Sequence, residues 1–134
     1  MADKTKNIRV LIVDDDHDIV DLLKNRLNHD GYATGVAYSG VEALGRYLLA
    51  CVDKPYDLIV LDIMMPKATG LEALVAIRKD ERAKGIEKIN GVKIVILTAD
   101  KQRYIEAFDY GCDDYCMKPY SPEDLMRKIV SLVG

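Results

Sequence analysis

The sequence predicts an α/β fold in which five parallel strands form a doubly wound sheet with helices on both faces. Short apolar runs rich in β-branched residues alternate five times with longer segments whose apolar residues recur at helical spacing. The runs at 8–13, 58–61 and 93–97 lack polar alternation, which is typical of strands buried on both faces. The weaker runs at 32–38 and 114–117 should therefore be the edges. Right-handed crossovers then give the strand order 2-1-3-4-5.

Four of the five segments that follow the predicted strands carry a signal for a helix start. Asp16 is suited to cap the first helix, and Ser39 and Thr69 each begin a capping-box pattern. Ser121 precedes a proline at the first position of the last helix. Residues 83–91 form a loop longer than most helix-to-strand connections, and we assign it no role. The side chains expected to face the core are those of Ile19, Val20, Leu23 and Leu27; Val41, Leu44 and Leu48; Leu71, Leu74, Val75 and Ile77; Ile105 and Phe108; and Leu125, Ile129 and Leu132.

Size, composition and charge narrow the functional classes. The 134 residues fit a single domain spanning 1–134, of which 1–7 form a polar N-terminal tail. A net charge of −3 and a sequence pI near 5.4 argue against nucleic acid as a direct partner, since such a partner normally needs a basic surface. No apolar run approaches the roughly 20 residues of a membrane span, and the N-terminus lacks the apolar core of a secretory signal. We therefore expect a cytoplasmic protein with no membrane partner.

The cysteines and histidines do not form a recognisable metal or redox motif. Cys51, Cys112 and Cys116 are an odd number with no Cys-x-x-Cys spacing. The favoured interpretation is three small apolar residues in a reducing compartment, ahead of a redox or zinc site. His17 and His29 are predicted to be exposed residues of the first helix rather than zinc ligands.

Polar side chains follow four of the five predicted strands. Asp14 and Asp15 follow the first strand, Asp62 ends the third, Thr98 ends the fourth and Lys118 follows the fifth. The carboxyl ends of parallel strands share one edge of the sheet, and ligands of open α/β sheets bind along that edge. We therefore expect these five side chains to meet, with Asp62 at the centre because it ends a central strand.

The chemistry of this group points to phosphoryl transfer with a metal ion. Three carboxylates at close range repel one another, so a cation should lie among them, and Mg²⁺ prefers oxygen ligands. Asp15, Asp62 and the backbone carbonyl of Met64 would supply such oxygens, and Asp14 could hold a coordinated water. A carboxylate can form an acyl phosphate, provided that the phosphoryl oxygens are neutralised. The metal, the Lys118 ammonium and the Thr98 hydroxyl would neutralise these oxygens, which favours Asp62 as a phosphoryl acceptor.

Four stretches of the chain resemble the signatures of the response-regulator receiver domain. They occur in the family's order and spacing and span nearly the whole chain; together they form a strong match, although none is specific alone. The stretches are Val13-Asp14-Asp15-Asp16, Leu61-Asp62-Ile63-Met64-Met65-Pro66, Leu97-Thr98-Ala99 and Asp114-Tyr115-Cys116-Met117-Lys118-Pro119.

The resemblance implies a flavodoxin-like sheet and a signalling role in a two-component or phosphorelay pathway. Asp62 would take a phosphoryl group from a phosphohistidine of a sensor histidine kinase or of a histidine phosphotransfer protein. The face formed by helix 4, strand 5 and helix 5 would then bind a downstream protein or a second copy. Such a protein is not a general enzyme, since it catalyses only its own phosphorylation and dephosphorylation. The implied residue roles are Mg²⁺ binding by Asp14, Asp15, Asp62 and the Met64 carbonyl, phosphoryl binding by Thr98 and Lys118, switching by Thr98 and Tyr115, and a cis peptide at Lys118-Pro119.

The same residues could also have simpler structural roles. Two adjacent acids at 14 and 15 would be redundant as a helix cap, which favours function. Thr98 alone would be an ordinary threonine at a strand end, and Tyr115 could be a core aromatic as well as a switch. Tyr104 and Tyr120 are expected to be surface or partner-facing residues.

Two other functional classes remain as alternatives. A phosphatase that uses an aspartyl phosphate usually has a second acid two residues after the nucleophile, where this chain has Met64. A flavin-binding domain of the same topology typically has a hydroxyl- and glycine-rich loop after strand 1, where this chain has three aspartates. Whether the chain is a stand-alone receiver or part of a longer regulator is left open by the sequence.

Overall fold

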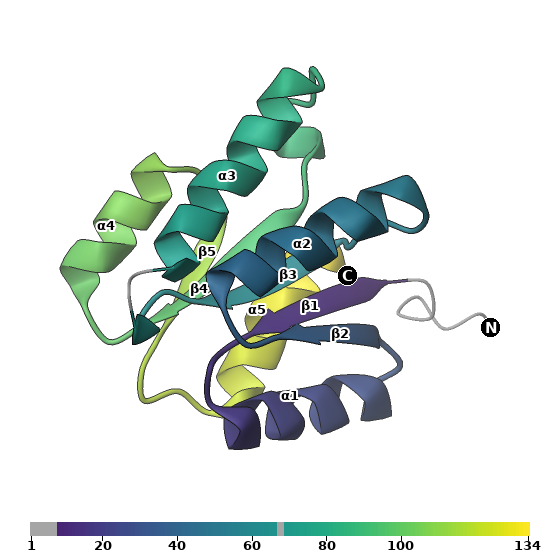
Figure 1. Cartoon of the computed structure of the whole chain (residues 1–134). Helices are drawn as coiled ribbons and strands as arrows, with labels where there is room; N and C mark the ends of the chain where they lie inside the picture. The colour runs from purple at the N-terminus through teal and green to yellow at the C-terminus, as the bar shows by residue number, and fades with distance from the viewer. Residues whose placement is uncertain (1–7, 67–68) are drawn as a thin grey trace.

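A computed structural model describes residues 8–66 and 69–134, and every structural statement below concerns these residues. Five parallel strands lie in the order β2-β1-β3-β4-β5 (Figure 1), which confirms the predicted class and strand order. The strands are β1 (Arg9–Val13), β2 (Ala33–Ala37), β3 (Leu58–Asp62), β4 (Lys93–Thr98) and β5 (Asp114–Met117). The helices are α1 (His17–His29), α2 (Gly40–Val52), α3 (Thr69–Ala83), the 3₁₀ turn η2 (Lys88–Asn90), α4 (Lys101–Asp109) and α5 (Pro122–Val133).

The sheet is covered on both faces, so alternate residues of each central strand enter different cores. Figure 1 shows α1 and α5 on one side of the sheet and α2 and α3 on the other. Leu11 and Ile59 pack with α2, α3 and α4, whereas Val10 and Val60 pack with α1 and α5. This arrangement explains why the central strands are apolar without alternation.

The helix starts follow the predicted capping signals, with one exception. Asp16 accepts hydrogen bonds from the backbone N–H groups of Asp18 and Ile19, and Ser39 accepts one from Glu42. Ser121 caps α5 with a proline directly after it. Thr69 is the exception, because α3 already begins at this residue; the position before it lies outside the described residues.

Several predicted core positions on the helices are wrong. Val41 and Leu48 of α2 are exposed, and the buried side chains of this helix include Ala43 and Tyr47 instead. Val75 of α3 is 37% exposed. The physical reason in α2 is that two opposite faces are apolar, so that periodicity cannot tell which one meets the sheet.

The same error occurs in α4. Ile105 and Phe108 are exposed, and Ala107 is the residue of this helix that the core buries completely. A small side chain lets the helix approach the sheet closely, and the larger apolar side chains then lie on its sides.

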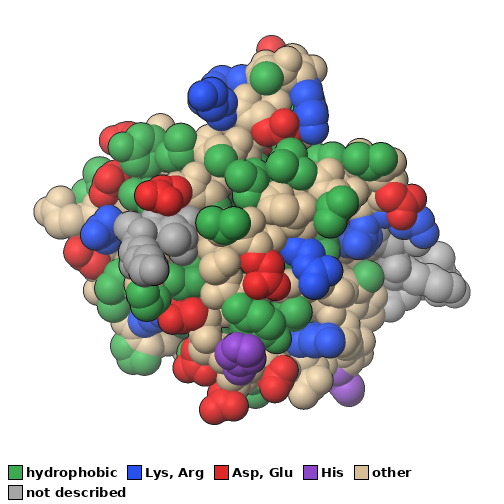
Figure 2. Space-filling model, in the orientation of Figure 1, with side chains coloured by type: hydrophobic (Ala, Val, Ile, Leu, Met, Phe, Trp, Pro, Cys, Tyr) green, Lys and Arg blue, Asp and Glu red, His purple; other side chains and the backbone are tan. Residues whose placement is uncertain are grey.

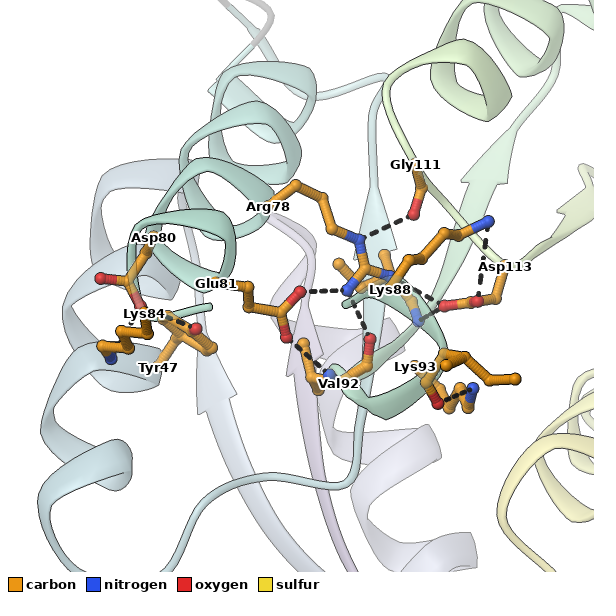
Figure 3. Close-up of polar contacts among 12 residues, drawn as sticks. Tyr47, Arg78, Asp80, Glu81, Lys84, Lys88, Val92, Lys93, Gly111 and Asp113 are labelled. Carbon is orange, nitrogen blue, oxygen red and sulfur yellow. Dashed lines mark hydrogen bonds and ion pairs between the residues drawn. The ribbon is translucent and has the colours of Figure 1, made fainter. Parts of the chain in front are cut away.

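A buried arginine organises the amino-terminal end of the sheet, a feature that the sequence did not predict (Figure 3). The Arg78 guanidinium donates to the backbone carbonyls of Gly111 and Val92, each at 2.8 Å, and to the carboxylates of Glu81 at 2.6 Å and Asp113 at 2.9 Å. Arg78 and Glu81 are almost completely buried. One side chain of α3 thereby joins the start of β4 to the start of β5.

This network also explains how the long loop at 83–91 is held. The Glu81 carboxylate accepts the Val92 N–H at 2.7 Å, so the end of the loop is bonded to the last turns of α3. An added Cβ at Gly91 would lie 2.4 Å from a Glu81 carboxylate oxygen, so only glycine fits beside that group. Within the loop, η2 forms a single 3₁₀ turn.

The cysteines and histidines lie as the sequence predicted. All three cysteines are free thiols, with Cys112 and Cys116 buried as small apolar residues. His17 and His29 are exposed, and His17 stacks on the Tyr38 ring at 3.9 Å between centroids. Among the helices described, none combines the length and apolar character that crossing a membrane requires.

Candidate functional site

The strand register brings the predicted site residues to one edge of the sheet. Val13 of β1 lies beside Leu61 of β3. Asp14 and Asp62, which come directly after these two residues, therefore lie next to each other at the edge of the sheet. Asp62 in turn lies beside Leu97 of β4, and Thr98 lies beside Met117 of β5. The carboxyl ends of four strands therefore meet, as the sequence predicted.

Three carboxylates form the centre of this edge. Asp14, Asp15 and Asp62 each offer an oxygen, and these oxygens lie within 4.8 Å of one another. Asp14 and Asp62 are buried, whereas Asp15 is exposed. The cluster is thus open to solvent on the side of Asp15, while Asp14 and Asp62 are shielded from solvent.

Asp14 is in an unusual electrostatic position. Its Oδ1 accepts the Asp16 N–H at 3.0 Å, but its buried Oδ2 has no hydrogen-bond partner among the described residues. Burial raises the pKa of Asp14 to about 7; the Asp16 N–H opposes this rise, and the Asp62 charge adds to it. A buried carboxylate oxygen without a donor is costly unless a cation or a water occupies its vicinity.

The donor set of this cluster fits a hard divalent cation. Every available ligand is an oxygen, and three carboxylates in one place leave negative charge that no single lysine balances. The buried Oδ2 of Asp14 points to the same conclusion, since it has no hydrogen-bond donor among the described residues.

Both oxygens of Asp62 already have donors. Oδ1 accepts the Met64 N–H at 2.7 Å, and Oδ2 accepts from the Lys118 ammonium at 3.0 Å. The Asp62 side chain is 3% exposed and that of Lys118 27%, so the lysine closes the site from the solvent side. The Met64 side chain itself is exposed. A buried carboxylate that is paired to an accessible ammonium is well placed to meet an incoming phosphoryl group.

Thr98 lies at the same edge, but its hydroxyl is bonded elsewhere. The Thr98 Oγ1 donates to the Asp100 carbonyl at 3.2 Å and lies 3.1 Å from the Asp100 N–H. The Asp100 carboxylate in turn caps α4 through the Gln102 N–H. This role of Asp100 was not predicted from the sequence; the Thr-x-Asp spacing before a helix is the signal that indicates such a turn.

The predicted switch residue Tyr115 lies on β5 and is half-buried. Its ring centroid is 3.8 Å from that of Tyr104, and the Lys128 ammonium lies 4.9 Å above it. Tyr104 and Tyr120, which were expected to be surface or partner-facing residues, are each partly buried. Tyr104 packs on Tyr115, and Tyr120 packs against the core under α1 and α5, where burial raises the pKa of its hydroxyl.

Two backbone features shape the walls of the site. The Lys118-Pro119 peptide is cis, as the resemblance implied. Gly70, at the start of α3, lies so close to β3 that an added Cβ would be 2.3 Å from the Asp62 carbonyl oxygen. Beside Lys118, a mostly apolar hollow of about 490 Å³ lies between α1 and the start of α5, lined in part by Ile19 and Leu22.

The sequence matches the family model of the response regulator receiver domain over residues 10–130. Response regulator ArlR of Staphylococcus haemolyticus (strain JCSC1435) is 34% identical over 122 residues, which are 90% of this chain and 50% of that protein. The transcriptional regulatory protein ResD of Bacillus subtilis (strain 168) is 34% identical over 133 residues, which are 98% of this chain and 50% of that protein. The chain thus spans about half the length of these relatives.

Solved structures of the same kind share the fold. The receiver domain of the Francisella response regulator 1452 has a TM-score of 0.76 at 33% identity, covering 95% of this chain and 97% of that one. The response regulator TrrA of Thermotoga maritima, in complex with Mg(2+)-BeF, has a TM-score of 0.75 at 34% identity, covering 93% and 98%.

Proposed function

The chain belongs to the response regulator receiver domains of two-component signalling, and on this premise we propose that Asp62 is its phosphoryl acceptor. The observation that carries the proposal is the position of the Asp62 carboxylate, which lies between the Lys118 ammonium at 3.0 Å and the acidic cluster with Asp14 and Asp15. No other carboxylate of the described residues combines this burial with a lysine and two further acids.

We propose that Asp14, Asp15 and Asp62 hold Mg²⁺ together with the backbone carbonyl of Met64. The ion would supply positive charge to phosphoryl oxygens and to the carboxylates themselves. The orphaned, buried Oδ2 of Asp14 supports this assignment. TrrA, a protein similar to this chain, was solved in complex with Mg(2+)-BeF, which supports the proposal.

In the proposed reaction, an Asp62 carboxylate oxygen attacks the phosphorus of a phosphohistidine. The new O–P bond forms as the P–N bond to the imidazole breaks, and the electron pair of that bond stays with the imidazole nitrogen. Lys118 would neutralise one phosphoryl oxygen. Hydrolysis of the resulting acyl phosphate, also at this site, would return Asp62 to its carboxylate form.

The proposed switch starts from the hydroxyl of Thr98. To donate to a phosphoryl oxygen it must give up the carbonyl of Asp100, the residue that caps α4. A change at this loop and at Tyr115 would alter the surface formed by α4, β5 and α5. We propose this surface as the contact for a downstream protein or a second copy.

The proposed phosphodonor is a sensor histidine kinase or a histidine phosphotransfer protein in the cytoplasm. The apolar hollow beside Lys118 would receive part of the donor, since it adjoins the ammonium that contacts Asp62. The direct contacts that we propose for this chain are with proteins. Nucleic acid and membranes are not among them.

The test is mass spectrometry of the intact chain after incubation with acetyl phosphate and Mg²⁺. The parent should gain one phosphate, and Asp62→Ala should gain none. Asp109→Ala, which removes an exposed acid at the end of α4, is the matched control and should behave as the parent. Phosphate uptake that survives in Asp62→Ala would show that another residue is the acceptor.

A further inference from the structure

The outer face of α2 is apolar along its whole length. Val41, Leu49 and Val52 are 78%, 74% and 88% exposed, and Leu48, next to them, is 41% exposed. Residues 41, 45, 48, 49 and 52 recur at the spacing of one helical face, about 16 Å long at 1.5 Å per residue. Figure 2, which looks onto the side of the molecule that carries α2, shows hydrophobic side chains at its surface there.

None of the residues that the structure describes covers this face. α2 packs on the sheet with its opposite side, through Ala43, Tyr47 and Ala50. Its 13 residues include only two with charged side chains, Glu42 and Arg46, whereas α1, of equal length, has four besides its two histidines. A contiguous apolar stripe of this kind marks an interaction surface more often than a solvated face.

A glycine at the middle of the stripe allows another helix to approach closely. Val41, Gly45 and Leu49 form one ridge at intervals of four residues, the kind of ridge that packs between the ridges of a second helix. An added Cβ at Gly45 would meet no heavy atom within 4 Å, so the space outside it is open. The ridge therefore has no side chain at its centre, Gly45, and a branched side chain at each end, Val41 and Leu49.

We propose that α2 is a self-association surface, on which α2 of a second copy packs antiparallel with Gly45 at the crossing point. Two-fold symmetry about Gly45 places Val41 of each copy opposite Leu49 of the other. It also brings Glu42 of each copy within reach of Arg46 of the other, because both flank the stripe on one side. Arg46 forms no ion pair within the described chain, so the charges of the two copies complement each other.

This contact is a reversible one. A single helix face is smaller than the roughly 800 Å² per partner that stable interfaces bury, so the dimer forms at high protein concentration. The surface lies across the sheet from α1 and α5 and does not include β5. Dimerisation through α2 is therefore independent of the phosphoryl acceptor and would persist if Asp62 were not phosphorylated.

Sedimentation equilibrium over a wide range of protein concentrations tests the contact. The apparent mass of the parent should rise from 15.0 kDa toward twice that value. Leu49→Lys should weaken association by about tenfold or more, since a buried leucine would be lost from both sides of the dyad. Ile89→Lys, at a position in η2 that is 74% exposed like Leu49, is the control and should leave the association constant unchanged. A chain that stays monomeric, or one in which Ile89→Lys weakens association as much as Leu49→Lys does, overturns the proposal.

Disulfide cross-linking tests the antiparallel arrangement. In a Cys51→Ser background, a mixture of Val41→Cys and Leu49→Cys chains should cross-link mainly to each other under mild oxidation. Each variant alone should cross-link several-fold more slowly, because like positions lie apart in the antiparallel pair. Faster cross-linking of Val41→Cys with itself would require parallel helices and contradict the geometry.

Discussion

The Nζ of Lys118 lies 3.0 Å from Oδ2 of Asp62, across an interval of 56 residues in the chain. The other oxygen of the same carboxylate accepts the Met64 N–H at 2.7 Å. Both oxygens of the proposed acceptor are therefore occupied before any phosphoryl group arrives. An incoming phosphoryl group must share the ammonium with Asp62 or take it over, which places Lys118 in the reaction itself.

Removal of this ammonium should slow phosphorylation of the chain. In Lys118→Met, the developing charge on the phosphoryl oxygens loses one of the two cations proposed to neutralise it, and we expect a rate at least about tenfold lower, or about 1.4 kcal/mol in the barrier. Timed mass spectrometry with acetyl phosphate and Mg²⁺ measures it. Lys101→Met, at the exposed start of α4, provides the control. An unchanged rate in Lys118→Met would remove the lysine from the proposed reaction.

Asp14 should make the metal-free protein less stable as the pH rises. Its pKa is raised from 3.8 to about 7, mainly by burial, so the folded chain keeps a proton that the unfolded chain releases near pH 4. The contribution of this group is fully present below about pH 4 and is lost as the pH rises through 7. We expect a loss on the order of 2–4 kcal/mol, which Asp14→Asn should abolish. Urea unfolding with a chelator at several pH values, comparing the two chains, measures the difference; parallel curves would contradict it.

The side chain at position 64 should influence how long the phosphoryl group lasts. Met64 is exposed beside Asp62 and cannot hold a hydrolytic water by hydrogen bonding. A polar side chain there can do so, and we therefore expect acyl phosphate to be lost faster from Met64→Asn than from the parent. The decay of the phosphorylated mass after removal of the phosphodonor is the measurement. Equal or slower decay would reject this explanation.

The strands and the site edge could be predicted because they depend on strong local signals. Uninterrupted apolar runs identify β1, β3 and β4, and each is followed by a polar residue at the edge where ligands bind. Asp14, Asp62 and Thr98 were therefore placed correctly without any knowledge of contacts.

Two kinds of feature could not be predicted from the sequence. One is which of two apolar helix faces packs on the sheet, and the other is a contact between residues far apart in the chain. The α2 helix has apolar residues on opposite sides, and tertiary packing chose Ala43 and Tyr47 over Val41 and Leu48. No local pattern indicates that a single arginine will join the start of β4 to the start of β5. Arg78 was consequently indistinguishable from the exposed charges of the same helix.

The Arg78 network should be the most sensitive polar feature of the fold outside the site (Figure 3). In Arg78→Met, the buried carboxylate of Glu81 loses its cation, Asp113 keeps only the Lys88 ammonium at 3.9 Å, and two backbone carbonyls lose a donor. Breaking such a buried pair typically costs about 3–5 kcal/mol, whereas Arg82→Met, exposed on the same helix, should cost less than about 0.5 kcal/mol.

Two measurements separate this prediction from a general loss of packing. Urea unfolding gives the free energy of unfolding of both variants. Hydrogen exchange should show the amides of Val92 and Ile94 losing protection first, because their acceptors are the carboxylates of Glu81 and Asp113. The amide of Met64, hydrogen-bonded to Asp62 at the opposite edge, should keep its relative protection. Equal stability of the two variants would mean that burial of this ion pair contributes nothing beyond what a methionine provides, as happens when apolar packing replaces the charges completely.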